Sequence, residues 1–227
     1  MSGISNTGFL TRVRDRAWWQ RFGKTLRYSL HVIVRPFDGF WDLTRERRGS
    51  MAAANFIVFM TLLTRILQLQ YTSFLFVRVN WARINVFTQM LSILLPLLIW
   101  CVANWSLTTL FEGKGRMRDI YLGSAYSLTP YVLIQLPLIL ISNMVTVEEG
   151  AFYSVLSSIS LIWCGLLLVV AMMMIHDYSL GKTLAFMVMS VFGMLVIIFV
   201  MMLFFSLVSD GIAYFVSLYK ELSFRLY

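Results

Sequence analysis

The sequence predicts an all-α polytopic membrane protein, a five-transmembrane-helix bundle with interfacial amphipathic helices at both ends. Three observations lead to this fold class. The 227-residue chain is 59% apolar and only 13% charged, with a mean hydropathy of +0.76, which is far from the composition of a water-soluble domain. Five apolar blocks are each long enough to cross the hydrocarbon core, which takes about 20 residues. The loops between these blocks are alternately rich and poor in Lys and Arg.

The apolar blocks divide the chain into three parts. We place the five spans at residues 51–77, 86–111, 120–145, 151–175 and 182–209. Residues 1–50 then form a cytoplasmic basic juxtamembrane segment, residues 51–209 the transmembrane domain and residues 210–227 an external interfacial tail. No part outside the spans is long enough to bury a core of its own.

The loop charges predict the orientation, because Lys and Arg near a span resist translocation and collect on the cytoplasmic side. Fourteen basic residues fall on one side, namely ten in segment 1–50 together with Lys114, Arg116, Arg118 and Lys182. Four fall on the other side, at Arg78, Arg83, Lys220 and Arg225. We therefore expect a cytoplasmic N-terminus and an external C-terminus in the cell (cytoplasmic) membrane. The same rule explains the net charge of +8, so we expect no nucleic-acid partner.

The first element in order is a basic amphipathic helix over residues 13–35, which Pro36 should end. Its apolar arc holds Trp18, Trp19, Phe22, Leu26, Leu30 and Ile33, and the opposite face carries Arg16, Gln20, Lys24, Arg27 and His31. Such a helix should lie in the headgroup plane of the bilayer. Trp18, Trp19, Arg16, Lys24 and Arg27 are the candidate lipid-headgroup contacts. Recognition of anionic lipid and simple anchoring are both open interpretations, and we favour anchoring.

The first span carries Arg65, a formal charge deep in an apolar block. Thr61, Arg65, Gln68 and Thr72 recur at helical spacing, so they should form one polar stripe. Asn104 and Gln135, in the second and third spans, are its candidate buried partners. Arg65 either belongs to this intramembrane polar cluster or extends its side chain to the outer headgroups.

The later spans have features that predict packing. Pro130 and Pro137 should kink the third span. The fourth has small residues at Ser154, Ser158 and Gly165, which allow close helix approach. Cys101 and Cys164 lie within spans and are expected to act as small core residues. The fifth is rich in Met and Phe, and after Asp210 the chain should continue as an interfacial helix on the outer face.

The sequence contains no catalytic signature, metal-ligand spacing or cofactor motif. His176 and Asp177 are predicted to sit at a cytoplasmic helix end, where they cap or hydrate the loop. We expect no second polar cluster at that depth, and hence no enzyme activity. Segment 134–137 (Ile-Gln-Leu-Pro) matches the end of the coupling-loop motif of binding-protein-dependent permeases, but the preceding residues do not fit that motif.

Several loop motifs resemble those of a known family. They are Arg35-Pro36-Phe37-Asp38-Gly39-Phe40-Trp41, Glu112-Gly113-Lys114-Gly115, Tyr126 with Pro130, and His176-Asp177-Tyr178-Ser179-Leu180-Gly181-Lys182-Thr183. Over roughly residues 30–215 the chain resembles a bacterial member of the YIP family, five-span membrane proteins named for relatives that bind Ypt/Rab GTPases. The resemblance implies five spans, a cytoplasmic N-terminus and no enzyme activity. We do not extend the Rab-binding role to this chain.

We therefore expect a non-enzymatic membrane scaffold or accessory protein. The first alternative is a subunit of a solute transporter, such as an ATP-driven sugar transporter. The second alternative is a lipid-handling role. The expected partners are the bilayer, its anionic headgroups and other membrane proteins.

Overall fold

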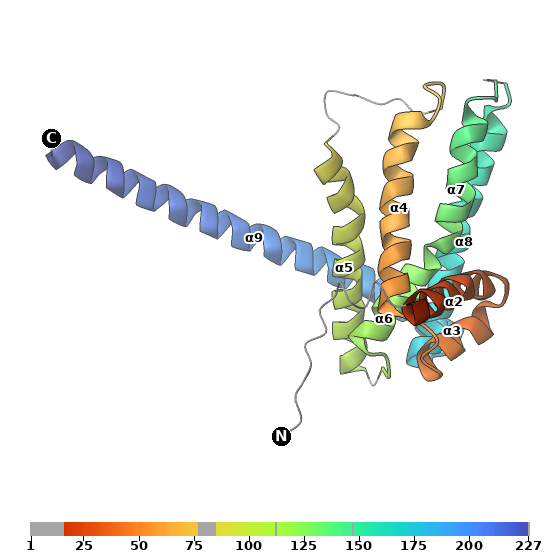
Figure 1. Ribbon diagram of the computed structural model, residues 1–227. Helices are drawn as coiled ribbons and strands as arrows, with labels where there is room; N and C mark the ends of the chain where they lie inside the picture. The colour runs from red at the N-terminus through yellow and green to blue at the C-terminus, as the bar shows by residue number, and fades with distance from the viewer. Residues whose placement is uncertain (1–15, 77–84, 112, 147, 227) are drawn as a thin grey trace.

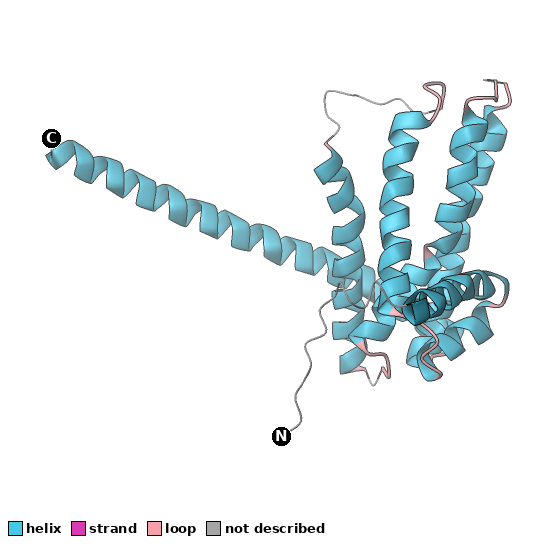
Figure 2. Ribbon diagram, in the orientation of Figure 1, coloured by secondary structure: helices cyan, strands magenta, loops and turns pink. Residues whose placement is uncertain are grey.

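The computed structural model describes residues 16–76, 85–111, 113–146 and 148–226, which form helices joined by turns and short loops (Figures 1 and 2). The helices are α2 (Arg16–Val34), α3 (Pro36–Arg45), α4 (Met51–Tyr71), α5 (Val86–Leu110), α6 (Met117–Ser127), α7 (Thr129–Ser142), α8 (Gly150–His176) and α9 (Leu180–Leu226). Five stretches are long and apolar enough to cross a membrane, with α6 and α7 together making one of them. The prediction of an all-α, five-span protein is confirmed.

The spans α4, α5, α6–α7 and α8 stand side by side, α9 projects away from them, and α2 and α3 lie across one end of the four (Figure 1). The loops that lead into α6 and α9 lie at this same end, whereas the loops that follow α4 and α7 lie at the opposite end. The chain therefore crosses the bundle in alternate directions, as the five predicted spans require. We call the end that carries α2 and α3 the basal end.

The first and third spans differ in detail from the prediction, and the fifth is longer than predicted. The first ends at Tyr71 and not at residue 77, because Thr72 is already extended, with ψ of 138°. At its start, Ser50 caps the helix by accepting a hydrogen bond from the Ala53 N–H at 3.1 Å. The third span breaks at Leu128, just before the proline that opens α7, while Pro137 lies inside α7. Only the break near Pro130 therefore divides the helix.

The amphipathic helix ends where predicted, since α2 stops at Val34 and Pro36 begins α3. Part of its apolar face is used for packing on the bundle. Val32 is fully buried and the Phe22 ring meets Phe56 of α4 edge-on, with centroids 5.5 Å apart. Trp19 and Leu30 stay exposed. The helix is thus fixed to the protein along one side and leaves a narrower apolar strip than the sequence predicted.

One hydrogen bond joins α2 to α3. The Tyr28 hydroxyl donates to the carbonyl of Gly39 at 2.9 Å. Burial, with a smaller contribution from Asp42, raises the pKa of Tyr28 to about 12, so the hydroxyl stays protonated and able to donate.

The core sits near the basal end, where α3, α4, α6 and α8 meet. Its largest fully buried side chains include Tyr126, Phe40, Leu43 and Ile120. Small residues let the helices approach, among them Ala53, Ala54, Ala125 and Ala171. Cys101 and Cys164 are buried free thiols, which agrees with a packing role.

Helix α9 leaves the bundle (Figure 1). It has 47 residues and is therefore about 70 Å long at 1.5 Å per residue. Thr183 and Ser190 are buried against the other helices, but from Ile198 to Phe224 its large apolar side chains are exposed. The helix does not end at Asp210, where the sequence suggested a new element. It continues because residues 210–226 contain no proline.

Candidate functional site

Two clusters of buried polar side chains lie inside the bundle. The first joins α4, α7 and α8 through two glutamines. Gln68 Nε2 donates to Gln135 Oε1 at 2.8 Å, and the Tyr131 hydroxyl donates to Gln68 Oε1 at 2.9 Å. Gln135 Nε2 in turn donates to the hydroxyls of Ser160 at 2.9 Å and Ser157 at 3.0 Å. Each buried amide therefore has partners on a neighbouring helix.

Arg65 lies at the edge of this glutamine cluster. It is partly exposed, and its Nη1 donates to Gln68 Oε1 at 3.5 Å, the long limit of a hydrogen bond. Thr61 is buried, but its hydroxyl donates to the Ile57 carbonyl of its own helix at 2.9 Å. The structure thus brings together Arg65, Gln68 and Gln135, whereas Thr61 makes no hydrogen bond to them.

Replacing Gln135 by leucine should destabilise the bundle by about 1–2 kcal/mol, since the Gln68 amide would lose its acceptor inside the bundle. Arg65→Leu should cost less than about 1 kcal/mol, because its hydrogen bond to Gln68 is long and its side chain is partly exposed. Thermal unfolding in detergent, with folded protein counted by size exclusion, measures both. Gln70→Leu, on the exposed face of α4, is the matched control. A larger loss for Arg65→Leu than for Gln135→Leu would contradict this ranking.

The second cluster lies at the basal end and is centred on His176, the last residue of α8. Its Nδ1 accepts the backbone N–H of Gly115 at 3.3 Å, so the ring proton belongs on Nε2. Nε2 lies 3.0 Å from Asn104 Oδ1 of α5, to which it donates. Asn104 Nδ2 then donates to the Ser190 hydroxyl of α9 at 3.1 Å. The chain of bonds connects the α6 loop with α8, α5 and α9, and we call it the histidine cluster.

This arrangement corrects two expectations. His176 was predicted to border the membrane and hydrate a loop, but it is only 2% exposed. Asn104 was predicted to join Arg65, but its amide nitrogen bonds to Ser190 and its amide oxygen to His176. A second polar cluster at the depth of His176 does exist. It could not be predicted from the sequence, because Asn104 lies 72 residues from His176 and 86 residues from Ser190 along the chain.

Two glycines make room for the imidazole. A Cβ on Gly115 would lie 2.5 Å from His176 Cε1 and 2.6 Å from Ile175 Cγ2. A Cβ on Gly113 would lie 2.6 Å from the Thr108 Cβ. The Gly-Lys-Gly sequence therefore lets the loop backbone lie directly against the end of α8. Glu112, the first residue of that motif, lies outside the described residues.

The loop after α8 completes the junction. The Tyr178 ring stacks on His176, with centroids 5.5 Å apart, and its hydroxyl donates to the Phe111 carbonyl at 3.1 Å. Lys182 places its ammonium 4.1 Å from the centre of the Tyr178 ring. Two of the four motifs on which the sequence resemblance rested, the one that holds Gly113–Gly115 and the one that begins at His176, are thus in direct contact.

Asp177 adopts a left-handed conformation, with φ of 59°, and ends α8. Its carboxylate accepts Lys114 Nζ at 2.8 Å and lies 3.7 Å from an Arg45 nitrogen. The hydrogen bond to Lys114 and the charges of Lys114 and Arg45 lower the pKa of Asp177. The contact with Lys114 therefore stabilises the fold above the ordinary aspartate pKa, and this contribution is lost as the pH falls through the lowered value.

The histidine cluster is suited to a structural role, since its hydrogen bonds hold the α6 loop, α8, α5 and α9 together. Both imidazole nitrogens are occupied, so neither is free to abstract a proton from a substrate. Among the described residues, no three His, Cys, Asp or Glu side chains gather where they could hold a metal ion.

The predicted lipid contacts on α2 fall into two groups. Lys24, Arg27 and Trp19 are exposed, while the side chains of Arg16 and Trp18 lie outside the described residues. Arg27 also lines an apolar cavity of about 440 Å³ between α2, α4 and α7, whose other walls include Leu26, Phe56 and Leu133.

A comparison with known families identifies one match. The model of the Yip1 domain matches residues 30–214, which run from α2 into α9 and include both polar clusters. No curated protein and no solved structure matches the chain.

Proposed function

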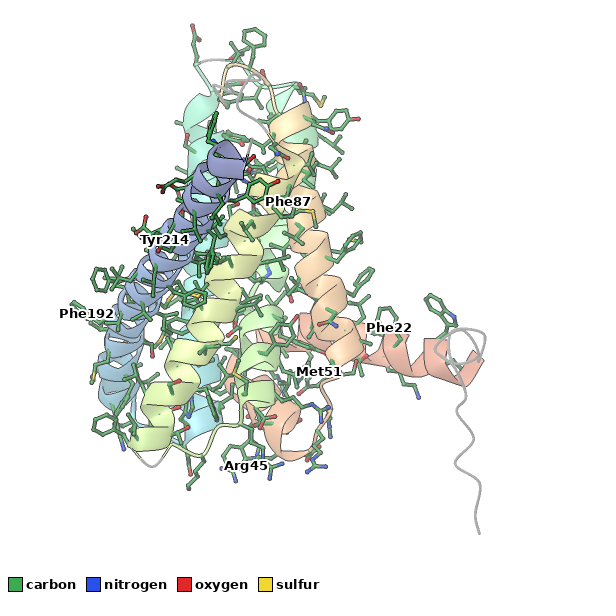
Figure 3. All side chains as sticks on the ribbon, turned by 90° about the vertical axis from the view of Figure 1, so that its left-hand side faces the viewer. Phe22, Arg45, Met51, Phe87, Phe192 and Tyr214 are labelled. Atoms are coloured by element: carbon green, nitrogen blue, oxygen red, sulfur yellow. The ribbon has the colours of Figure 1, made fainter. Side chains whose placement is uncertain are left out.

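Since the chain belongs to the Yip1 domain family, we propose that it is a non-enzymatic integral membrane scaffold or accessory protein of the YIP type. The observation that carries this proposal is the geometry of α9. The fifth spanning helix packs on the bundle only through its first part, and the rest presents apolar side chains on all sides. Figure 3 shows Phe192 and Tyr214 at different points along this helix.

The length of α9 supports a role in contacting other membrane proteins. A helix of about 70 Å is more than twice the roughly 30 Å thickness of the hydrocarbon core, so crossing the bilayer requires only part of it. Helices associate in membranes through packing of apolar faces rather than through hydrophobic exclusion from water. The portion after Ile197 is therefore available for a neighbouring protein.

The occupied imidazole of His176 supports the non-enzymatic part of the proposal. The I-x-L-P match that suggested a transporter subunit lies within α7, where Gln135 is buried against α8. A coupling loop would have to be exposed to an ATPase, so this placement weakens the transporter alternative.

The scaffold role is tested by affinity purification of the full chain from membranes in mild detergent. The variant combines Phe199→Ala, Phe204→Ala and Leu207→Ala on α9. The control combines Phe152→Ala, Leu161→Ala and Leu166→Ala, which are equally exposed on α8. We expect membrane proteins retained at fixed stoichiometry by the parent and the control to be lost from the α9 variant. Equal recovery from both variants would refute α9 as the contact surface, and a stoichiometric ATPase would favour a transporter subunit.

We further propose that the N-terminus is cytoplasmic and the C-terminus external. The clustering of Arg and Lys at the basal end and the pair Glu148–Glu149 near the other end support this orientation. Cysteines at Glu149 and Ser223 should react with a membrane-impermeant maleimide in intact cells, whereas one at Arg116 should react only after lysis. The buried native thiols give a low background. Labelling of Arg116→Cys in intact cells, or of only one outer site, would contradict the topology.

Lipid handling is the second candidate function, and the cavity beside α2 favours it. Its apolar walls suit an acyl chain, and Arg27 at its margin suits a headgroup phosphate. Leu133→Trp should fill part of the cavity and reduce lipid retained through purification, measured by native mass spectrometry. Leu140→Trp, at an exposed position of the same helix, is the control. Equal retention in both variants would argue against this function.

A further inference from the structure

A second cavity lies at the basal end, next to the histidine cluster. It measures about 380 Å³ and is enclosed by the end of α3, the turn that follows it and the loop into α6. Five cationic side chains line it, namely Arg45, Arg47, Lys114, Arg116 and Arg118, together with the carboxylate of Asp119. We call it the basic cavity.

Most of its positive charge is not neutralised by the protein. Asp177 is shared between Lys114 and Arg45. In the described part of the chain, Arg47, Arg116 and Arg118 have no carboxylate within 4.0 Å. The neighbouring Arg48 differs from them, because Asp42 and Glu46 pair with it at 3.3 and 2.6 Å. Cations gathered around one cavity repel each other, and a bound anion would remove that repulsion.

The backbone around the cavity adds to this positive potential. Helix α6 begins at Met117, and its N-cap residue Arg116 makes no side-chain cap, so the positive end of the helix dipole adds to the potential here, with Asp119 in the first turn offsetting part of it. Arg47 has a φ of 53°, a left-handed conformation that an arginine rarely adopts. Backbone strain of this kind is found where the surrounding structure holds a residue for function.

We propose that the basic cavity binds the phosphate group of an anionic lipid headgroup. Arginine guanidinium groups match phosphate with two parallel hydrogen bonds each, and a phosphomonoester carries up to two negative charges for the unneutralised cations. Helices α2 and α3 lie across this end (Figure 1). Trp41 and Phe37 of α3 are exposed, as is typical of aromatic side chains at the headgroup level. The position thus favours a lipid over a soluble phosphate as the source.

The test measures thermal stability of the full chain in neutral detergent during titration with a short-chain phosphatidic acid. Short-chain phosphatidylcholine and inorganic phosphate are titrated in parallel. The variant is Arg47→Gln/Arg116→Gln/Arg118→Gln. The control is Arg35→Gln/Lys182→Gln/Lys220→Gln, which removes the same charge from exposed positions that line neither this cavity nor the one beside α2. We expect phosphatidic acid to stabilise the parent and the control, with at least tenfold weaker binding to the cavity variant. Phosphatidylcholine should have no such effect.

Asp119→Asn provides a second test that does not depend on the folding of the triple variant. It removes the carboxylate from the cavity lining and should strengthen phosphatidic acid binding severalfold. Equal weakening by the cavity and control variants, or no change with Asp119→Asn, overturns the site. Equal stabilisation of the parent by inorganic phosphate overturns the lipid as the source.

Discussion

Gly115→Ala should lower the free energy of unfolding by about 1–3 kcal/mol, the usual cost of forcing a methyl group into a packed site. The new Cβ would meet the His176 ring at 2.5 Å and Ile175 at 2.6 Å, so the loop would have to move away from α8. This movement would also lengthen the hydrogen bond from the Gly115 N–H to His176 Nδ1. The substitution therefore disturbs packing and the histidine cluster together.

Two other glycines serve as matched controls for this prediction. Gly165 lies within α8 and Gly181 near the start of α9, and an added Cβ at either position meets nothing within 4 Å. Their replacement by alanine should be neutral or stabilise the helix by about 0.5–1 kcal/mol. Thermal unfolding in detergent, with size exclusion to count folded protein, compares the three variants. A Gly115→Ala protein as stable as the Gly181→Ala protein would show that the loop does not press on His176.

His176→Ala should be at least as damaging as Gly115→Ala. It removes a fully buried ring and leaves the Gly115 N–H without its acceptor and Asn104 Oδ1 without its donor. Each unsatisfied buried group costs about 1–3 kcal/mol, and the cavity adds to that loss. By contrast, Asp177→Asn keeps the left-handed turn and loses only exposed ion pairs, so its stability should change little.

The same variant separates a structural histidine from a catalytic one. If His176 has a purely structural role, the loss of cellular function in His176→Ala should be proportional to the loss of folded protein. Asn104→Leu should then produce a similar defect, because it breaks the same chain of bonds from the other side. A His176→Ala protein that is as stable as the parent yet inactive would contradict this structural role and indicate a chemical one.

Much of the fold could be predicted because the bilayer imposes a simple rule on the sequence. Every backbone polar group in the hydrocarbon core must be satisfied within a helix, so each span appears as a long apolar run. The end of α2 could be predicted for an equally local reason, because Pro36 has no backbone N–H to continue the helix. The end of α4 at Tyr71 was harder to predict from the sequence, since residues 72–77 are as apolar as those within the helix.

The polar clusters could be predicted only in part. Arg65 and Gln68 could be placed on one face because their spacing matches the helical period. Gln135 does bond to this face, through Gln68. Asn104 was assigned to the same group because sequence alone does not give the rotation of one helix against another. Packing turns Asn104 toward α8 and α9, where it meets His176 and Ser190.

The sequence by itself determined the number of spans, their alternation and the membership of the family, because hydrophobic length and loop charge act locally along the chain. Only the tertiary structure decided which polar side chains meet, which glycines are required and how α9 leaves the bundle. These features depend on side-chain distances between helices, and such distances result from the packing of the whole bundle. The contact between Gly115 and His176 shows this most directly: each residue lies in its own loop motif, and the reason for pairing a glycine with a buried imidazole exists only where the two loops touch.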